Sequence, residues 1–130
     1  MSDGLLLDTN VLIWTLSASN RISTNAKRAM TRSKTAMSVS VVSVWEIILK
    51  HKAGKLIIKP ALDQLVDQIL YHSPWTILHV CPEHLLPVIT LPMLHKDPFD
   101  RLLIAQARHE GLTIVTSDEL IPKYDVRTIW

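Results

Sequence analysis

The chain has 130 residues, of which 48% are hydrophobic and 20% charged, so its composition excludes a disordered protein and predicts a single domain spanning residues 1–130. Cys81 is the only cysteine, which excludes an internal disulfide bond and fits a reducing compartment. Pro87 and Pro92 interrupt the apolar stretch around residues 85–94, and no basic residue precedes the first apolar run. Neither a membrane span nor a signal peptide is therefore expected, and we predict a soluble, cytoplasmic protein that does not bind a membrane.

The net charge is only +2, but basic residues are concentrated in the first half of the chain. Between Thr9 and Leu62 the one acidic residue is Glu46, whereas nine residues are basic. They are Arg21, Lys27, Arg28, Arg32, Lys34, Lys50, Lys52, Lys55 and Lys59. A half-chain of this kind suits a polyanionic partner such as a nucleic acid, although a solvated basic face is an alternative explanation.

The first predicted element is a strand of three leucines, residues 5–7, between Gly4 and Asp8. Because this run lacks polar alternation, it is typical of a parallel strand buried on both faces. Asn10 is the predicted N-cap of a helix that begins at Val11. Asp8 thus lies where a strand leads into a helix, the edge at which open α/β sheets bind ligands. An isolated aspartate there is more simply a turn or cap residue, so its role depends on whether other acids reach the same edge.

Strands and helices alternate along the rest of the chain. Further strands are predicted at residues 36–41, 75–80, 113–116 and 126–129. Helices are predicted after Ser23 or Thr24, at residues 42–53 with Gly54 as cap, between Pro60 and Pro74, between Pro82 and Pro92, and from the segment 95–101 to Glu110 with Gly111 as cap. This alternation predicts an α/β fold whose mainly parallel sheet is covered by helices on both faces.

Acidic residues recur at one edge of the predicted sheet. Asp8 and Asp118 each follow a parallel strand directly, and Asp100 lies in the first turn of a helix. Part of this pattern has a structural explanation, because Asp97 as N-cap, Pro98 at the first position and Asp100 at the third make a favourable helix start. We assign that role to Asp97 and leave both interpretations open for Asp100.

Glu46 is unusual because its helical segment, residues 44–49, is apolar on nearly all sides. A half-buried carboxylate is unfavourable unless it meets a cation. Lys50, four residues later, can form a salt bridge with Glu46, but such a helix pair contributes only about 0.3–0.5 kcal/mol. A functional role for Glu46 is therefore the favoured interpretation.

Four acids that converge require a cation. Two carboxylates about 4 Å apart repel by roughly 4 kcal/mol at an effective dielectric constant near 20, so several cannot remain ionised together unaided. All-oxygen ligands favour Mg²⁺ or Mn²⁺ over zinc. Apart from these four acids the chain carries 14 basic and 8 acidic residues. An acidic metal site in basic surroundings is suited to the hydrolysis of a phosphodiester.

Competing chemistries lack their motifs. The sequence has no G-x-S-x-G, no H-E-x-x-H, no cysteine pair for zinc and no glycine-rich phosphate loop. The six histidines show no ligand spacing and are interpreted as surface or core residues, with His95, beside the acidic segment, as a minor candidate for contact with substrate. The tryptophans are interpreted as core packing and not as base-stacking platforms; they are Trp14, Trp45, Trp75 and Trp130.

Four blocks of sequence resemble the signatures of PIN-domain ribonucleases, in particular the small bacterial VapC-type toxins of type II toxin–antitoxin pairs. The blocks are LLDTNV at residues 6–11, SVWEI at 43–47, DPFDRLLIAQA at 97–107 and IVTSD at 114–118. One block alone is weakly specific, but all four in order at these spacings are strongly specific, and the similarity covers nearly the whole chain.

The resemblance implies a PIN-domain-like three-layer α/β/α fold and a Mg²⁺- or Mn²⁺-dependent endoribonuclease. By position, Asp8 and Asp100 match the family's principal metal ligands. Glu46 and Asp118 match its second and fourth acids, which complete the site directly or through water, and Thr116 matches a hydroxyl residue beside the fourth acid. The resemblance also implies a homodimer and a small antitoxin protein whose tail enters the active site.

We therefore predict that Asp8, Asp100 and Asp118 hold metal and that Glu46 orients metal or water for attack on an RNA phosphate. The basic residues expected to guide a single-stranded or structured RNA are Arg21, Lys27, Arg28, Arg32 and Lys50. Two alternatives remain open. One is a PIN-like nuclease of RNA processing without an antitoxin, and the other is a non-catalytic module that binds RNA or a protein partner.

Overall fold

The computed structural model describes residues 4–32, 36–58 and 61–130, and within them a five-stranded sheet forms the centre of the molecule. Its strands are β1 (Leu5–Leu7), β2 (Met37–Ser40), β3 (Thr76–Leu78), β4 (Thr113–Val115) and β5 (Thr128–Ile129). The order is β3-β2-β1-β4-β5, and all four neighbouring pairs are parallel, with Leu6 opposite Ser38 on one side and Ile114 on the other. β1 is therefore the central strand, with β2 and β3 on one side of it and β4 and β5 on the other.

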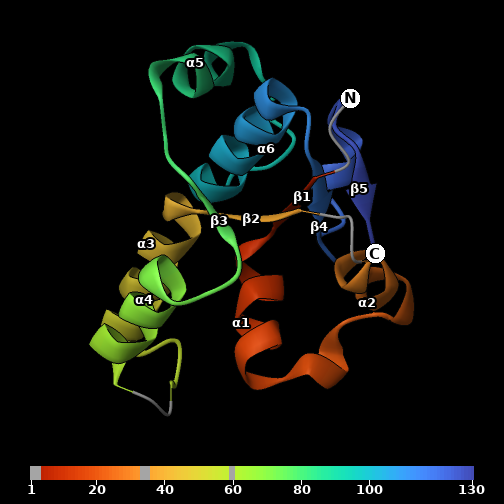
Figure 1. Ribbon diagram of the computed structural model, residues 1–130. Helices are drawn as coiled ribbons and strands as arrows, with labels where there is room; N and C mark the ends of the chain where they lie inside the picture. The colour runs from red at the N-terminus through yellow and green to blue at the C-terminus, as the bar shows by residue number, and fades with distance from the viewer. Residues whose placement is uncertain (1–3, 33–35, 59–60) are drawn as a thin grey trace.

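Helices cover both faces of this sheet (Figure 1). They are α1 (Thr9–Ser17), α2 (Thr24–Thr31), α3 (Val41–Lys52), α4 (Leu62–Tyr71), α5 (Pro82–Leu85) and α6 (Pro98–Glu110), with short 3-10 turns η1 (Ser19–Arg21), η2 (Leu86–Thr90) and η3 (Ile121–Lys123). α5 and α6 lie on one side of the sheet, and α1, α3 and α4 lie on the other. The predicted three-layer α/β/α arrangement with a parallel central sheet is confirmed.

Alternation along β1 produces two cores. Leu5 and Leu7 pack with buried residues of α1 to α4, whereas Leu6 packs with buried residues of α6. Successive side chains of a strand point to opposite faces, so an all-leucine strand supplies both layers at once. Each fully buried leucine contributes roughly 1.5–3 kcal/mol, which fixes the position of β1 and of the residue that follows it.

Several predicted helix ends agree with the structure. The hydroxyl of Ser23 caps α2 by accepting from the Ala26 N–H, and the carboxylate of Asp97 caps α6 by accepting from the Phe99 N–H. Gly111 ends α6 with a positive φ of 69°, a conformation that favours glycine.

The predicted start of α1 is wrong by two residues. The helix begins at Thr9, with Asp8 rather than Asn10 at the N-cap. The Asp8 N–H still donates to the Val115 carbonyl as in the sheet, while its own carbonyl already accepts from the Leu12 N–H, so strand and helix meet at one residue. The Asp8 carboxylate makes no capping hydrogen bond, which argues against a purely structural role for this side chain.

Other boundaries shift modestly. The strands are shorter than predicted, the helix expected at residues 82–92 is divided into α5 and η2, and α3 spans Val41–Lys52, with Gly54 in a left-handed conformation just beyond its end. The predicted opening of a helix at Pro60 lies outside the described residues. Among the residues that the structure describes, no helix combines the length and the apolar character that a membrane crossing requires.

Candidate active site

The predicted acids lie around the switch point of the sheet. The chain leaves β1 toward β2 and leaves β4 toward β5, in opposite directions, and such a divergence opens a crevice at the carboxyl ends of the two strands. Asp8 follows β1, and Asp118 follows β4 after two residues. Glu46 comes from α3, the helix after β2, and Asp100 from the first turn of α6. Four separate segments thus bring carboxylates toward one edge.

A chain of hydrogen bonds connects the acids that follow β1 and β4. The Thr116 hydroxyl donates to Asp8 Oδ2 at 2.7 Å and accepts from the Asp118 N–H at 2.9 Å. Asp8 is only 4% exposed, and Thr116 is buried beside it. The predicted supporting role of Thr116 is consistent with this geometry, because its hydroxyl fixes one oxygen of Asp8.

His95 extends this chain to α6. Its Nε2 lies 3.1 Å from Asp118 Oδ2 and 3.0 Å from Asp100 Oδ2, while its Nδ1 accepts from the Asp97 N–H at 3.1 Å. The Tyr124 hydroxyl accepts from the His95 N–H at 2.8 Å. His95 therefore lies between two of the predicted metal ligands, whereas its position in the sequence made it only a minor candidate for contact with substrate. Its adjacency to the acidic segment was the available signal.

Glu46 has one partner for two buried oxygens. Its side chain is 4% exposed, and Oε2 accepts from Lys50 Nζ at 2.8 Å, which confirms the i,i+4 ion pair. Although burial lowers the pKa of Lys50, its hydrogen bond and attraction to Glu46 raise it overall. Oε1 has no hydrogen-bond partner among the described residues. A buried carboxylate oxygen without a partner is costly, and a bound cation satisfies it.

The pKa values show how closely the acids crowd one another. Burial raises the pKa of Asp100 to about 8, and repulsion from Asp8, Asp97 and Glu46 adds to the effect. Burial also raises the pKa of Asp8, with further repulsion from Glu46 and Asp118, although the Thr116 hydroxyl lowers it. Partial burial raises the pKa of Asp118, but N–H groups of the following turn and His95 outweigh it, and the net shift is downward.

These observations fit a divalent cation. The donors are carboxylate oxygens, the type preferred by Mg²⁺ and Mn²⁺, and a positive ion among them offsets the repulsion that raises the pKa of Asp8 and Asp100. His95, Asp100 and Asp118 also place one potential ligand atom each within 4.8 Å of one another. Asp100 and Asp118 of this cluster could hold the ion together with Asp8, whose charge acts on Asp100, and Glu46 has the unsatisfied Oε1.

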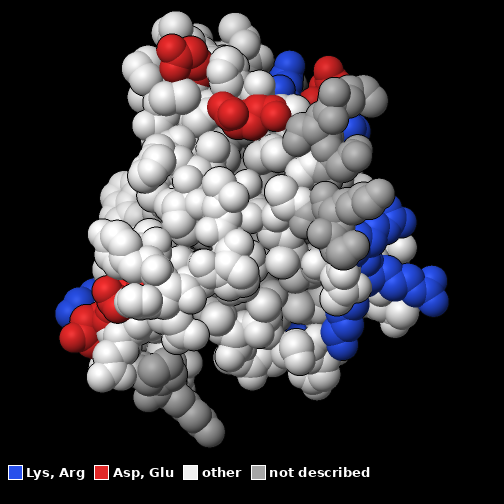
Figure 2. Space-filling view, viewed as in Figure 1, with Lys and Arg blue, Asp and Glu red and all other residues white. Residues whose placement is uncertain are grey.

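The predicted RNA-guiding residues do not all gather here. Lys50 pairs with Glu46 at the site, whereas Arg21 lies over the Trp14 ring at 4.5 Å. The exposed Lys27 and Arg28 lie on α2 and Arg32 directly follows it, and Figure 2 shows basic side chains gathered over this helix. Figure 1 places α2 beside the C-terminus, away from α3, which carries Glu46, and from α6, which carries Asp100. A path for RNA over α2 stays a prediction.

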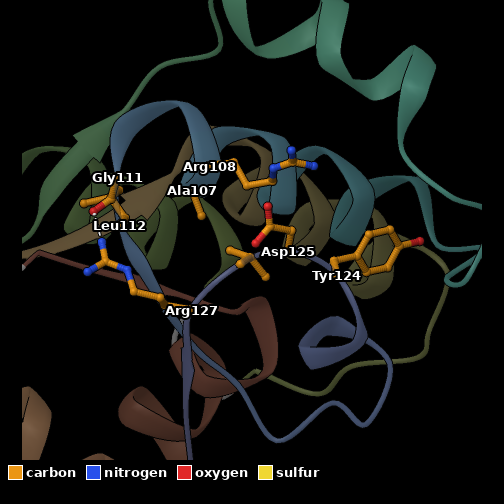
Figure 3. A pocket seen from close by; sticks show the side chains of 8 residues that line it. Ala107, Arg108, Gly111, Leu112, Tyr124, Asp125 and Arg127 are labelled. Carbon is orange, nitrogen blue, oxygen red and sulfur yellow. Dashed lines mark hydrogen bonds between the residues drawn. The ribbon is translucent and has the colours of Figure 1, made fainter.

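A pocket of about 520 Å³ lies at the other end of α6 (Figure 3). Arg108 borders it from α6, and Asp125 and Arg127 border it from the segment before β5. Arg127 Nη2 donates to the Gly111 carbonyl at 2.7 Å, so one of its two arginines is engaged in holding the helix end. The pocket brings one carboxylate where the switch point brings four, and it is the weaker candidate for catalysis.

Comparisons with solved structures agree with the fold. The fold is similar to that of VapBC from Salmonella typhimurium bound to DNA, with 18% identity, 98% of this chain and 97% of that chain covered, and a TM-score of 0.69. It is also similar to VapBC2 from Rickettsia felis bound to a promoter DNA fragment, with 18% identity, 96% of both chains covered and a TM-score of 0.68. FitAcB from Neisseria gonorrhoeae gives 20% identity, 95% of both chains and a TM-score of 0.67.

No curated protein matches the sequence. The PIN domain family, by contrast, matches residues 5–127, which include all four predicted acids. This match confirms the family that the four sequence blocks resemble. The chain belongs to the PIN domain family, a family of nucleases that generally use a divalent metal ion.

Proposed function

We propose that this PIN domain protein is a Mg²⁺- or Mn²⁺-dependent endoribonuclease and acts in the cytoplasm as the toxin of a toxin–antitoxin pair. One observation carries the proposal. Carboxylates from four segments converge at the switch point, and one of them, Glu46, keeps a buried oxygen without a hydrogen-bond partner among the described residues. Such crowding of like charge is unfavourable unless the site binds a cation.

Each residue has a role in this proposal. Asp8, Asp100 and Asp118 hold the ion, which, when bound, lowers the pKa of water and offsets charge on the attacked phosphate. Thr116 keeps one oxygen of Asp8 oriented through its 2.7 Å hydrogen bond. Glu46, anchored by Lys50, offers its remaining oxygen to the ion or to water.

The test is cleavage of total cellular RNA by the purified protein with Mg²⁺ or Mn²⁺ and with EDTA. Asp8→Asn and Asp100→Asn should each abolish cleavage. Asp125→Asn removes an exposed carboxylate at the opposite end of α6 and should cleave like the wild type. Cleavage that survives EDTA or both site variants would contradict the assignment of the acids. A folded wild-type protein that binds RNA but never cleaves it would favour the non-catalytic module.

The proposed partners are a small antitoxin and a second copy of the chain. The neighbour from Klebsiella pneumoniae is described as a toxin–antitoxin complex. Large apolar side chains are also exposed around η2, namely Leu85, Leu86, Ile89, Met93 and Leu94. Contiguous exposed apolar side chains are typical of surfaces that bind another protein.

Light scattering measures both associations. The protein alone should have the mass of a dimer, and addition of the small protein encoded beside it should give a larger complex that no longer cleaves RNA. A monomer at micromolar concentration would contradict the homodimer. Active protein that binds no such partner would favour the RNA-processing nuclease.

A further inference from the structure

Trp45 is 56% exposed, so its predicted place in the core is wrong. It lies on α3 directly before Glu46, and because neighbouring residues of a helix differ by about 100° in direction, the buried face holds Glu46 while Trp45 faces solvent. Its ring meets the Phe99 ring edge-on, with centroids 5.2 Å apart and planes inclined at 70°. Phe99 directly precedes Asp100. Two aromatic rings thus lie one residue away from two of the four acids.

A pocket of about 480 Å³ adjoins these rings, between α3 and the start of α6. Its apolar lining comes from Leu49, Pro98 and Phe99, and its basic lining from Lys50, Lys55 and Lys96. Glu46 and Asp97 also line it, so the pocket is continuous with the acidic site. We call this pocket, together with the Trp45 ring, the aromatic–lysine pocket.

We propose that the aromatic–lysine pocket binds an unpaired nucleotide of the RNA beside the phosphate that is cleaved, with its base stacked on the exposed Trp45 ring and its edge against Phe99. This inference rests on the proposed nuclease function and identifies the part of the site that selects its substrate. Aromatic side chains stack bases of any sequence, and lysines neutralise the flanking phosphates. Because a base inside a duplex is already stacked, the pocket selects a single strand at this position.

The charges around the rings favour RNA over a protein segment as the occupant. Three lysines and two carboxylates line the pocket, and the exposed Trp45 ring lies beside it against Phe99. An aromatic ring next to an excess of lysines is the combination with which proteins bind single-stranded nucleic acids. The exposed Lys55 and Lys96 extend the positive charge of Lys50 away from its partner Glu46. These lysines are therefore placed for phosphates next to the one at the acidic site.

Binding is measured on the Asp8→Asn protein, so that the RNA stays intact. The probe is a labelled ten-nucleotide oligoadenylate, free or annealed to oligouridylate. The single strand should quench the intrinsic tryptophan fluorescence, and Trp45→Phe should remove most of that quenching. Trp45→Ala should weaken binding by about fivefold or more, and Lys96→Ala should weaken it and reduce its salt dependence.

Tyr71→Ala is the matched control. Tyr71 is 74% exposed and lies at the end of α4, just before the amino end of β3. The acids lie at the carboxyl ends of the strands, so the loss of the Tyr71 ring should leave RNA binding unchanged. Equal affinity of Trp45→Ala and the parent protein for the single strand would overturn the proposal, as would equal affinity of the parent for the duplex. Quenching by a partner protein but not by RNA would also overturn it.

Cleavage by the otherwise wild-type protein separates the two proposals. If the wild type cleaves RNA with metal, and Trp45→Ala has the same cleavage rate and the same affinity for RNA, the nuclease proposal stands and the pocket assignment fails. If it does not cleave but the single strand quenches Trp45, the pocket stands as a binding site and the nuclease proposal fails.

Discussion

Within the part of the chain that the structure describes, two clusters combine a buried histidine with at least one carboxylate, and they differ in how completely their polar groups are paired. One is His95 with Asp100 and Asp118 at the switch point, and the other is Cys81 with His84 and Glu110 between α5 and α6. In each cluster, one potential ligand atom per residue lies within 4.8 Å of the others. Proximity and residue type alone therefore do not distinguish a catalytic centre from a structural one.

The second cluster is satisfied within itself. His84 is 1% exposed, its Nε2 lies 2.9 Å from Glu110 Oε2, and its Nδ1 accepts from the Cys81 N–H as part of a capping box for α5. Cys81 and Glu110 meet different nitrogens of the ring, so both nitrogens of His84 already have partners within the protein. The Glu83 carboxylate raises the pKa of the Cys81 thiol, which makes it a poor nucleophile.

The first cluster is not satisfied within itself. Asp8 and Glu46 add their charges to those of Asp100 and Asp118, and repulsion among them contributes to the raised pKa of Asp8 and Asp100. The first cluster thus indicates a functional site, because its like charges are held together against their repulsion. The second cluster indicates a structural role, because its polar groups are paired with one another. Substitutions at matching positions of the two clusters can break this comparison.

The largest expected difference is in catalysis. Asp8→Asn should lower the rate of metal-dependent RNA cleavage by about 100-fold or more, because a neutral amide holds a cation far less well than a carboxylate. Glu110→Gln should leave the rate within about twofold of wild type. Initial rates at saturating Mn²⁺, corrected for the folded fraction by circular dichroism, measure both. A comparable loss in Glu110→Gln would mean that the second cluster takes part in the reaction.

The next largest effect is on stability and has the opposite distribution. His84→Ala should lower the free energy of unfolding by about 2–4 kcal/mol, because it leaves a cavity and removes the partner of the Cys81 N–H, with cleavage per folded molecule unchanged. His95→Ala should mainly lower the rate of cleavage per folded molecule and have a smaller effect on the free energy of unfolding than His84→Ala. The reason is that Asp100 and Asp118 lose the imidazole that lies between their carboxylates. Urea denaturation followed by fluorescence gives the stabilities. Reversed results for the two histidines would exchange the roles of the clusters.

The strands, the helix caps and two acids of the candidate site could be predicted from the sequence. The leucine run before Asp8 and the strand before Asp118 place two acids at the carboxyl edge, because side-chain alternation and strand direction follow from local pattern. The capping residues Asp97 and Gly111 were equally local, since a cap is defined within about four residues.

The rest depends on contacts between distant residues. His95 is held in place by Tyr124, 29 residues later, so its position requires the packed loop and cannot follow from spacing. Arg101 adds to this by donating from its buried guanidinium to the Pro92 carbonyl at 2.9 Å. The exposure of Trp45 was missed because a helical segment that is apolar on nearly all sides does not show which side faces solvent.

A smaller effect appears in the pH dependence of the metal-free protein. Burial and neighbouring charges raise the pKa of Asp100 from 3.8 to about 8, so the folded chain binds more protons than the unfolded chain between these values. The stability that Asp100 contributes is therefore fully present below about pH 4 and is lost as the pH rises through 8. In EDTA, the free energy of unfolding of Asp100→Asn should exceed that of the wild type by about 1–3 kcal/mol at pH 8.5 and equal it at pH 4.

Thermal unfolding across this pH range tests the sign. Addition of Mn²⁺ should raise the stability of the wild type at pH 8.5 and close the gap to Asp100→Asn. Glu110→Gln should show no gain at pH 8.5 in EDTA. A destabilised Asp100→Asn at high pH would mean that the carboxylate is compensated within the protein, as in the second cluster.

The smallest effect is expected at Cys81. Cys81→Ser keeps a side chain that can cap α5, and serine is a favoured N-cap residue, so the melting temperature should stay within about 1 °C of wild type. The rise in melting temperature on adding Mn²⁺ should also be unchanged, because the proposed ion site lies among the carboxylates at the switch point. A smaller rise in Cys81→Ser than in wild type would show that the thiol holds metal, and the resemblance between the two clusters would then be functional as well as compositional.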